Sequence, residues 1–228
     1  MKVNREEFLR LLESVAPGLA TQGVEQCDCF AFMKGMVVTY NDEVSCRAPC
    51  ELAKDDPVVV PADPLLNLLR KRPDEEIDLE VKGNSLKILG KRRRSWVNQE
   101  AELLMGIRNV EKPGKWVTLP EGFSEAVEAS SHCASTDSSR FAITCINFHP
   151  KWIESCDDSQ LCRWILNTGI KQGFLIRRNA AKFIPTLGMT EWSVGEGWVH
   201  FRNGSGLVLS CRKYTEEFPE LTLFFQEN

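Results

Sequence analysis

Two stretches of the sequence decide the fold. Residues 58–92 read VVVPADPLLNLLRKRPDEEIDLEVKGNSLKILGKR, and residues 174–212 read FLIRRNAAKFIPTLGMTEWSVGEGWVHFRNGSGLVLSCR. Both start with a short apolar strand, continue into a short helix, and end in two strands joined by a turn that contains glycine. Ile77 and Leu79 correspond to Trp192 and Val194 at the same offset. This correspondence predicts a structural unit that occurs twice along the chain.

A helix and a group of strands precede each stretch. The predicted helices are NREEFLRLLESVA (4–16) and EGFSEAVEASSHCA (121–134), and strands follow them at 27–48 and 140–166. We therefore predict an α+β fold with two tandem domains, residues 1–110 and 111–228. In each domain the helices are expected to pack on one face of an antiparallel sheet.

Three residues mark the expected helix ends. Asn4 is predicted to cap the first helix, with Glu7 three residues later. Asp63, which precedes Pro64, predicts the start of the second. Pro185 falls inside the last predicted helix and should shorten or kink it.

The composition indicates a soluble globular protein. Of the 228 residues, 43% are hydrophobic and 26% are charged, and no apolar run is long enough to span a bilayer. The charged N-terminus does not resemble a signal peptide, so a cytoplasmic location without membrane contact is expected. The net charge is -4, so any contact with nucleic acid must come from a local basic patch rather than bulk positive charge.

The polar residues give little support for a catalytic or metal-binding function. Four of the nine cysteines, Cys27, Cys29, Cys46 and Cys50, lie close together in the sequence. They could hold zinc, but their spacing differs from the usual C-x2-C pattern, and buried thiols are favoured. No nucleophile context surrounds the three histidines, and 83–91 (GNSLKILGK) is not a phosphate-binding loop. No catalytic residue, metal or cofactor is therefore predicted.

Several of these segments, taken in order, resemble a known family. The most similar are 57–88, FSEAVEASSHCASTDSSRFAITCINF (123–148), the Ile176-Arg177-Arg178 turn and SCRKYTEEFPEL (210–221). The chain resembles the bacterial beta sliding clamp, the processivity subunit of the replicative DNA polymerase. That subunit has three such domains, so this chain resembles a shortened two-domain form, a size that suits a phage replication system.

The resemblance implies a protein that encircles duplex DNA without catalysing a reaction. The family forms a ring of six domains with the helices inside, so two domains per chain imply a homotrimer. Basic residues on the helices would then contact phosphates without reading the DNA sequence. The candidates are Arg5, Arg10, Arg70, Lys71, Arg72, Arg177, Arg178 and Lys182. The alternative is that these faces are only solvated.

The resemblance also implies that DNA polymerase and the clamp loader dock short peptides into an apolar groove. The groove candidates are Tyr40, Val44, Cys156, Leu161, Leu223, Phe224 and Phe225. The 156–161 run, CDDSQL, differs from the family's Thr-Asp-Gly-His-Arg-Leu. The basic run Lys91–Arg94 is expected on a strand or sheet edge, and is not assigned to DNA.

Two other functions are compatible with the sequence. The first is a monomeric clamp-like adaptor or decoy that binds peptides of replication proteins without encircling DNA. The second is an enzyme that uses a cysteine such as Cys156, or a zinc-stabilised module.

Overall fold

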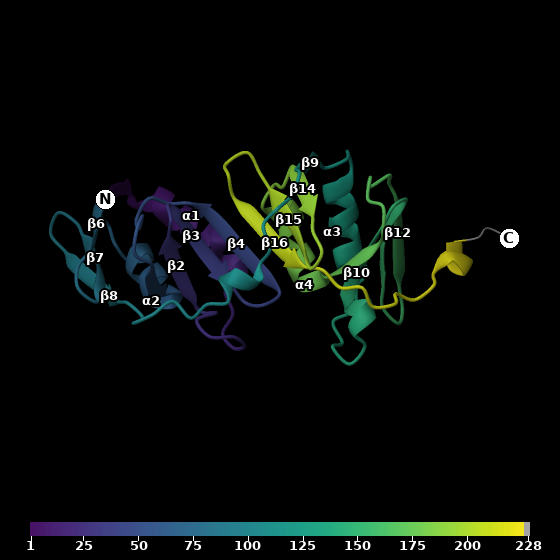
Figure 1. The fold of residues 1–228 in the computed structure, drawn as a ribbon, viewed down its shortest axis with the longest axis horizontal. Coiled ribbons are helices and arrows are strands. Elements are labelled where there is room, and N and C mark those ends of the chain that lie inside the picture. Colours follow the sequence, from purple (N-terminus) through teal and green to yellow (C-terminus); the bar gives the residue numbers. More distant parts are fainter. Residues whose placement is uncertain (226–228) are drawn as a thin grey trace. The chain divides into compact units, whose positions relative to one another are not determined.

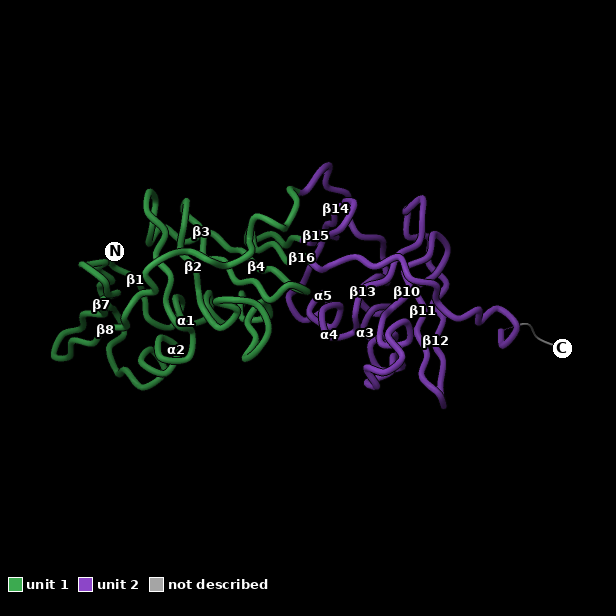
Figure 2. Tube along the Cα trace, turned by 60° about the horizontal axis from the view of Figure 1, so that its bottom comes forward, with its two compact units in different colours: residues 1–112, 202–210 green, residues 113–201, 211–228 purple. Residues whose placement is uncertain are grey.

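The structure, a computed structural model, describes residues 1–225. The chain divides into two compact units (Figure 2). Unit 1 contains residues 1–112 and 202–210, and unit 2 contains residues 113–201 and those from 211 onward. The division between Lys112 and Pro113 lies near the expected domain boundary, whereas residues 202–210 are grouped with unit 1.

The first half of the chain contains two helices and eight strands (Figure 1). In chain order the elements are β1 (Lys2–Asn4), α1 (Arg5–Val15), the 3-10 turn η1 (Ala16–Gly18), β2 (Cys29–Met33), β3 (Met36–Tyr40), β4 (Val44–Pro49), β5 (Val58–Pro61), α2 (Ala62–Arg70), β6 (Glu76–Val81), β7 (Ser85–Leu89), β8 (Arg94–Asn98) and η2 (Ile107–Asn109).

The second half follows the same order of elements. These are β9 (Val117–Thr118), α3 (Phe123–Cys133), η3 (Phe141–Thr144), β10 (Cys145–His149), β11 (Trp152–Cys156), β12 (Leu161–Ile165), β13 (Phe174–Arg177), α4 (Arg178–Ala181), α5 (Phe183–Thr186), β14 (Glu191–Val194), β15 (Trp198–Arg202), β16 (Val208–Arg212) and η4 (Thr222–Phe225).

The strand order repeats between the halves. In the first half β1, β6, β7 and β8 are neighbours in that order, as are β9, β14, β15 and β16 in the second. The orders β5-β2-β3-β4 and β13-β10-β11-β12 match in the same way. Ile77 pairs with Val3, and its predicted counterpart Trp192 pairs with Val117. The strands form antiparallel sheets with helices on one face, which confirms the predicted α+β class.

The predicted helix ends are confirmed at one position and wrong at another. The Asn4 side chain accepts hydrogen bonds from the Glu6 and Glu7 backbone N–H groups at 2.9 and 3.1 Å, which caps α1. Helix α2 begins at Ala62, one residue before Asp63, and Pro61 occupies its cap. Asp63 instead lies in the first turn, where its negative charge interacts favourably with the helix dipole.

The last helical segment is interrupted. Lys182 separates α4 from α5, and Pro185 lies within α5. Proline has no backbone N–H to donate to the carbonyl four residues earlier, so a continuous helix would lose that bond. The predicted shortening is confirmed.

Each unit has its own aromatic core. Phe8 stacks on Phe32 in unit 1, and Phe123 packs edge-on against Trp192 in unit 2. The four clustered cysteines are buried in unit 1. Burial is the main reason why the pKa values of the Cys29 and Cys46 thiols rise to about 12. Within residues 1–225, no helix combines the length and apolar composition that crossing a bilayer requires.

Candidate functional site

Three of the predicted DNA-facing residues in unit 1 are exposed around α1 and α2. Arg10 lies on α1 and pairs with Glu6 at 2.5 Å, and Arg70 ends α2 and pairs with Glu13 of α1 at 3.0 Å. The two arginine side chains remain 72% and 51% exposed. Lys71 follows α2 and is also exposed. These cations can reach solvent, but each arginine has a carboxylate partner.

The other two predicted residues of unit 1, Arg5 and Arg72, bind to other groups of the same unit. The Arg5 guanidinium donates to the Asp74 carbonyl at 3.1 Å and weakly to the Leu69 carbonyl at 3.4 Å. The Arg72 side chain is only 2% exposed and pairs with Asp74 at 3.0 Å. It also donates to the Ile88 carbonyl and the Ser95 hydroxyl at 3.1 and 2.9 Å. A buried arginine with these partners cannot contact DNA, so the expectation for Arg72 needs correction.

The exposed charges around α1 and α2 nearly cancel. The acidic residues Glu6, Glu7, Glu13 and Asp63 are exposed together with Arg10, Arg70 and Lys71. The four carboxylates outnumber the three cations, so these residues together produce no net positive field, and phosphate contact would depend on individual arginine and lysine side chains.

In unit 2, two predicted residues lie beside a surface pocket of about 390 Å³ between α3 and the α4–α5 segment. Arg178 and Lys182 line it with Glu128, Ser131, His132, Pro185 and Thr186. The Arg178 guanidinium donates from Nη1 to the Ala134 carbonyl at 3.2 Å, which holds the end of this side chain beside the C-terminus of α3. Arg177 lies over the Phe141 ring at 5.5 Å. The sequence did not predict that Glu128 and His132 lie close to Arg178.

Two of the predicted groove residues belong to the core of unit 1. Tyr40 is 1% exposed, and its hydroxyl donates to Asp42 at 2.9 Å. Val44 is 3% exposed. Neither side chain is accessible to a docking peptide, so the structure does not support these two candidates.

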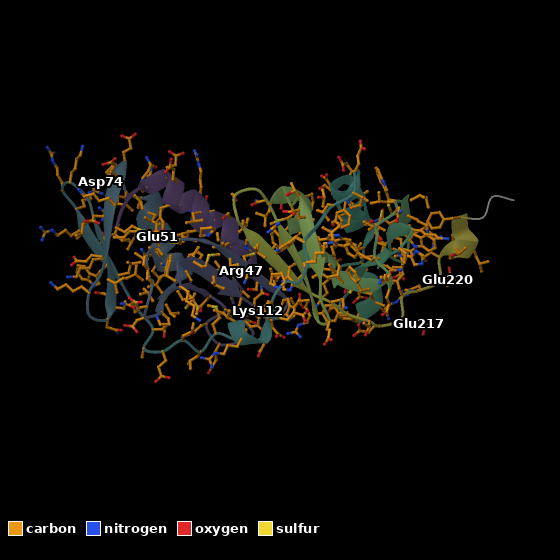
Figure 3. All side chains as sticks on the ribbon, turned by 45° about the horizontal axis from the view of Figure 1, so that its top comes forward. Arg47, Glu51, Asp74, Lys112, Glu217 and Glu220 are labelled. Carbon is orange, nitrogen blue, oxygen red and sulfur yellow. The ribbon has the colours of Figure 1, made fainter. Side chains whose placement is uncertain are left out.

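The other candidates meet in unit 2. Cys156 at the end of β11 packs with Ile143 of η3 and with Leu221 near the C-terminus, and Leu161 and Phe218 adjoin this apolar cluster. A pocket of about 380 Å³ lies beside it, lined by residues 140–143 on one side and 217–220 on the other. We call this pocket and cluster the unit 2 groove. Arg140 on one side and Glu217 and Glu220 on the other are the charged residues of its lining, and the two glutamates are labelled in Figure 3.

The remaining candidates lie beyond the groove. Leu223 and Phe224 are 74% and 70% exposed, whereas Phe225 is 39% exposed and packs on Arg163 of β12. Sequence reasoning missed Ile143, Phe218 and Leu221. The last two lie in the FPEL sequence (218–221), which carried the family resemblance but was not assigned to the groove.

The Cys156 thiol does not favour catalysis. It is 6% exposed, and desolvation is the main cause that raises its pKa above the ordinary value. A raised pKa keeps the sulfur protonated near neutral pH, whereas the thiolate is the reactive form. Packing against Ile143 and Leu221 accounts for this residue.

Each unit also has an open sheet edge. Strand β8 ends the β1-β6-β7-β8 sheet of unit 1, and Lys91–Arg93 form the exposed turn before it. The Trp96 side chain on β8 is 65% exposed. Strand β12 ends the β13-β10-β11-β12 sheet of unit 2, and Ile165 on it is 74% exposed. Open edges of this kind can pair with another chain.

Several solved structures share this fold. The DNA polymerase III beta chain of Streptococcus pneumoniae TIGR4 matches with a TM-score of 0.83 at 14% identity, covering 100% of this chain and 68% of that one. The beta subunit from Thermotoga maritima gives 0.80 at 17% identity, with 99% and 67% covered. The DNA polymerase sliding clamp of Bacillus subtilis gives 0.81 at 11% identity, with 100% and 67% covered.

No protein-family model and no curated protein matches the chain. The structural likeness establishes the class of fold: this is the fold of the bacterial sliding clamps. The chain spans about two thirds of the length of each of these clamps.

Proposed function

We propose that the protein is a DNA sliding clamp that encircles duplex DNA and tethers replication proteins to it. The whole-chain match to beta clamps is the observation that carries this proposal. The protein acts by binding, without catalysing a reaction.

The ring is a homotrimer. A ring of six clamp domains needs three chains with two domains each, related by cyclic symmetry. Its contacts join the β8 edge of one copy to the β12 edge of the next. Charge supports this pairing, because Lys91–Arg94 lie beside β8 while Asp157, Asp158 and Glu220 lie near β12.

DNA contact is weak and independent of sequence. Arg10, Arg70 and Lys71 in unit 1 and Arg178 and Lys182 in unit 2 offer positive charge to phosphates. Topological enclosure needs no tight site, and weak phosphate contacts allow the ring to slide. The unit 2 groove receives short peptides of DNA polymerase and the clamp loader, because it combines an apolar floor with an open pocket.

The proposal can be tested by measuring how long the protein is retained on linear DNA with blocked or open ends. The protein is threaded onto linear duplexes anchored to beads at one end, and streptavidin then blocks the free end. We expect protein to survive a high-salt wash on blocked DNA and to leave after a restriction enzyme cuts the duplex. Equal loss from blocked and open DNA would contradict encirclement. If the protein is then found to bind replication peptides as a monomer, the adaptor function replaces the clamp.

Removing the carboxylate partners of the two exposed arginines should strengthen DNA binding. The double variant Glu6→Gln, Glu13→Gln removes the partners of Arg10 and Arg70. Because exposed ion pairs are worth at most about 1 kcal/mol, we expect a rise of about threefold in affinity for duplex DNA at low salt. Fluorescence anisotropy at several salt concentrations measures it.

The matched control is Glu25→Gln, which removes an exposed carboxylate from a loop outside α1 and α2. It should raise the affinity for duplex DNA less than the double variant does. Unchanged affinity in the double variant would show that Arg10 and Arg70 do not contact DNA.

A further inference from the structure

We propose that Cys133 and Cys162 form an intrachain disulfide when the protein meets a small-molecule disulfide, and that this bond holds the edge strand β12 against α3. Such a modification site is independent of the proposed clamp function. It also bears on that function, because β12 is the edge that we assign to the ring contact.

These two cysteines differ from the others in exposure. All nine cysteines lie within residues 1–225, and all are free thiols. Seven of them are buried, whereas Cys133 and Cys162 are partly exposed. A reagent in solution can therefore reach this pair before it reaches the others.

The strand register directs Cys162 toward α3. Cys162 is the partner of Ser155 on the neighbouring strand β11, and directly opposed residues of an antiparallel pair point to the same face of the sheet. The Ser155 hydroxyl donates to the Ser130 carbonyl of α3 at 2.6 Å, so α3 covers this face. Cys162 therefore faces the helix.

The end of α3 lies over the start of β12, as Figure 1 also shows. Cys133 is the last residue of α3 and lies close to one turn beyond Ser130, on the same side of the helix. Just before β12, the Gln160 side chain donates to the His132 carbonyl at 3.3 Å, which ties the helix end to this strand. The Cys162 thiol lies within hydrogen-bonding distance of the Cys133 thiol.

Only a small movement separates this contact from a covalent bond. A disulfide requires the two sulfur atoms to approach to about 2 Å. Rotation of the two cysteine side chains between staggered rotamers moves the sulfur atoms without moving the backbone. The two thiols are therefore held close to the geometry of the bond that we propose.

The other two cysteines of this sheet face the opposite side. Phe148 on β10 packs against Phe123 of α3, and Cys145 lies an odd number of residues before it on the same strand. Cys156 directly follows Ser155 on β11. Because side chains alternate along a strand, Cys145 and Cys156 point away from α3. Neither is placed to compete for Cys133.

The bond forms by two thiol–disulfide exchanges, with glutathione disulfide as the oxidant. One protein thiol loses its proton and attacks a sulfur of glutathione disulfide, which gives a mixed disulfide and releases one glutathione thiolate. The second protein thiol loses its proton and attacks the protein sulfur of that mixed disulfide, which forms the internal S–S bond and releases the second glutathione thiolate. The released thiolates take up the two protons, so the protein is oxidised and glutathione disulfide is reduced.

The exchange should be faster at higher pH. Burial is the main cause that raises the pKa of the Cys133 thiol above its ordinary value, and the neighbouring Cys162 and Asp157 raise this pKa further. Only the thiolate attacks a disulfide, so the rate of closure should increase as the pH rises toward that pKa. The equilibrium yield depends instead on how closely the two sulfur atoms are held.

The test equilibrates the reduced full-length chain with mixtures of reduced and oxidised glutathione. The remaining thiols are then alkylated in denaturant, and the intact mass is measured. We expect a product in which seven of the nine thiols are alkylated and no glutathione is attached, and proteolysis should show Cys133 linked to Cys162. At about 1 mM reduced glutathione this product should exceed the mixed disulfide at least about tenfold, because the second thiol is already in place.

Two variants identify the pair. Cys133→Ser should give a glutathione adduct at Cys162 without an internal bond. The matched control is Cys145→Ser, which removes a buried thiol of the same unit and should close like the native chain. Glutathione adducts at both residues of the native chain, no reaction at either residue, or a bond from either to another cysteine would overturn the proposal.

Hydrogen exchange tests whether the bond holds β12. An edge strand is paired on one side only, and a covalent tie to α3 should reduce its local opening. At equal dilution, we expect the β12 amides of the closed chain to exchange at least about threefold more slowly than those of the reduced chain, whereas β8 amides should not change. Equal exchange of β12 in both states would contradict this role. Neither assay contains DNA, so a loss of DNA retention would count against the clamp alone.

Discussion

Replacing Arg72 with methionine is expected to lower the free energy of unfolding by about 3–5 kcal/mol, because it leaves a buried charge without its partner. Asp74 is 10% exposed at its side chain and would lose the ion pair. The Ile88 and Arg93 carbonyls would also lose donors that now lie at 3.1 and 3.0 Å. Urea unfolding measures the change.

The matched control is Arg70→Met. Arg70 pairs with Glu13, but both side chains are about half exposed, so we expect a change within about 1 kcal/mol. A similar small effect at Arg72 would show that the buried pair does not hold this part of unit 1.

The Arg72 network also positions the basic turn. Asp74 accepts a hydrogen bond from the Lys91 backbone N–H at 3.0 Å. A Cβ atom at Gly90 would lie 2.3 Å from an Asp74 carboxylate oxygen and 2.5 Å from the Arg72 guanidinium. The glycine is thus needed for the close approach of this turn. An arginine expected to touch DNA instead fixes the sheet edge that we assign to ring closure.

Reversing the charge of that turn should abolish self-association. In the triple variant Arg92→Glu, Arg93→Glu, Arg94→Glu, acidic side chains of one copy would face acidic residues near β12 of the next. Like charges at an interface cost several kcal/mol, so we expect assembly to weaken by at least about 100-fold. Sedimentation velocity should show monomer at concentrations where the native chain is assembled, and retention on end-blocked DNA should be lost.

The matched control replaces three exposed lysines elsewhere in unit 1 with glutamate: Lys34, Lys54 and Lys112. It changes the net charge equally and should leave assembly intact. A second check converts Asp158 and Glu220 to lysine in the arginine variant and should restore part of the association. If the arginine variant assembles like the native chain, β8 does not form the contact.

The repeat and the fold class could be predicted because they depend on local patterns. Alternating apolar residues fix which face of a strand is buried, and the match of Ile77 with Trp192 agrees with their equivalent pairings in the structure. Asn4 and Pro185 act on the neighbouring turn of helix, so their effects follow from sequence alone.

The burial of Arg72 could not be predicted in the same way. Arg70, Lys71 and Arg72 are consecutive basic residues at a helix end and look alike in sequence. The helix ends at Arg70, and the chain then turns Arg72 toward carbonyl groups on β7 and the turn before β8. Those acceptors come from residues far along the chain, so only the tertiary structure distinguishes the buried arginine from the exposed ones.

The groove could be predicted only in part, because one of its sides comes from a segment that is distant in the sequence. Cys156 and Leu161 bound the run that takes the place of the family's Thr-Asp-Gly-His-Arg-Leu, and both lie at the apolar cluster. Tyr40 and Val44 occupy the equivalent positions in the first half of the chain and lie in the core. An open groove requires a wall as well as a floor. Residues 217–220 supply that wall in unit 2, and a segment so distant in sequence gives no local signal at β11 or β12.

The mass of the assembly in solution tests the central claim most directly. Sedimentation equilibrium of the native chain over a wide concentration range should reveal a species of three times the 25.8 kDa chain mass, which dissociates to monomer on dilution. A chain that remains monomeric at the highest concentration, or that stops at a dimer, would contradict a ring of three copies.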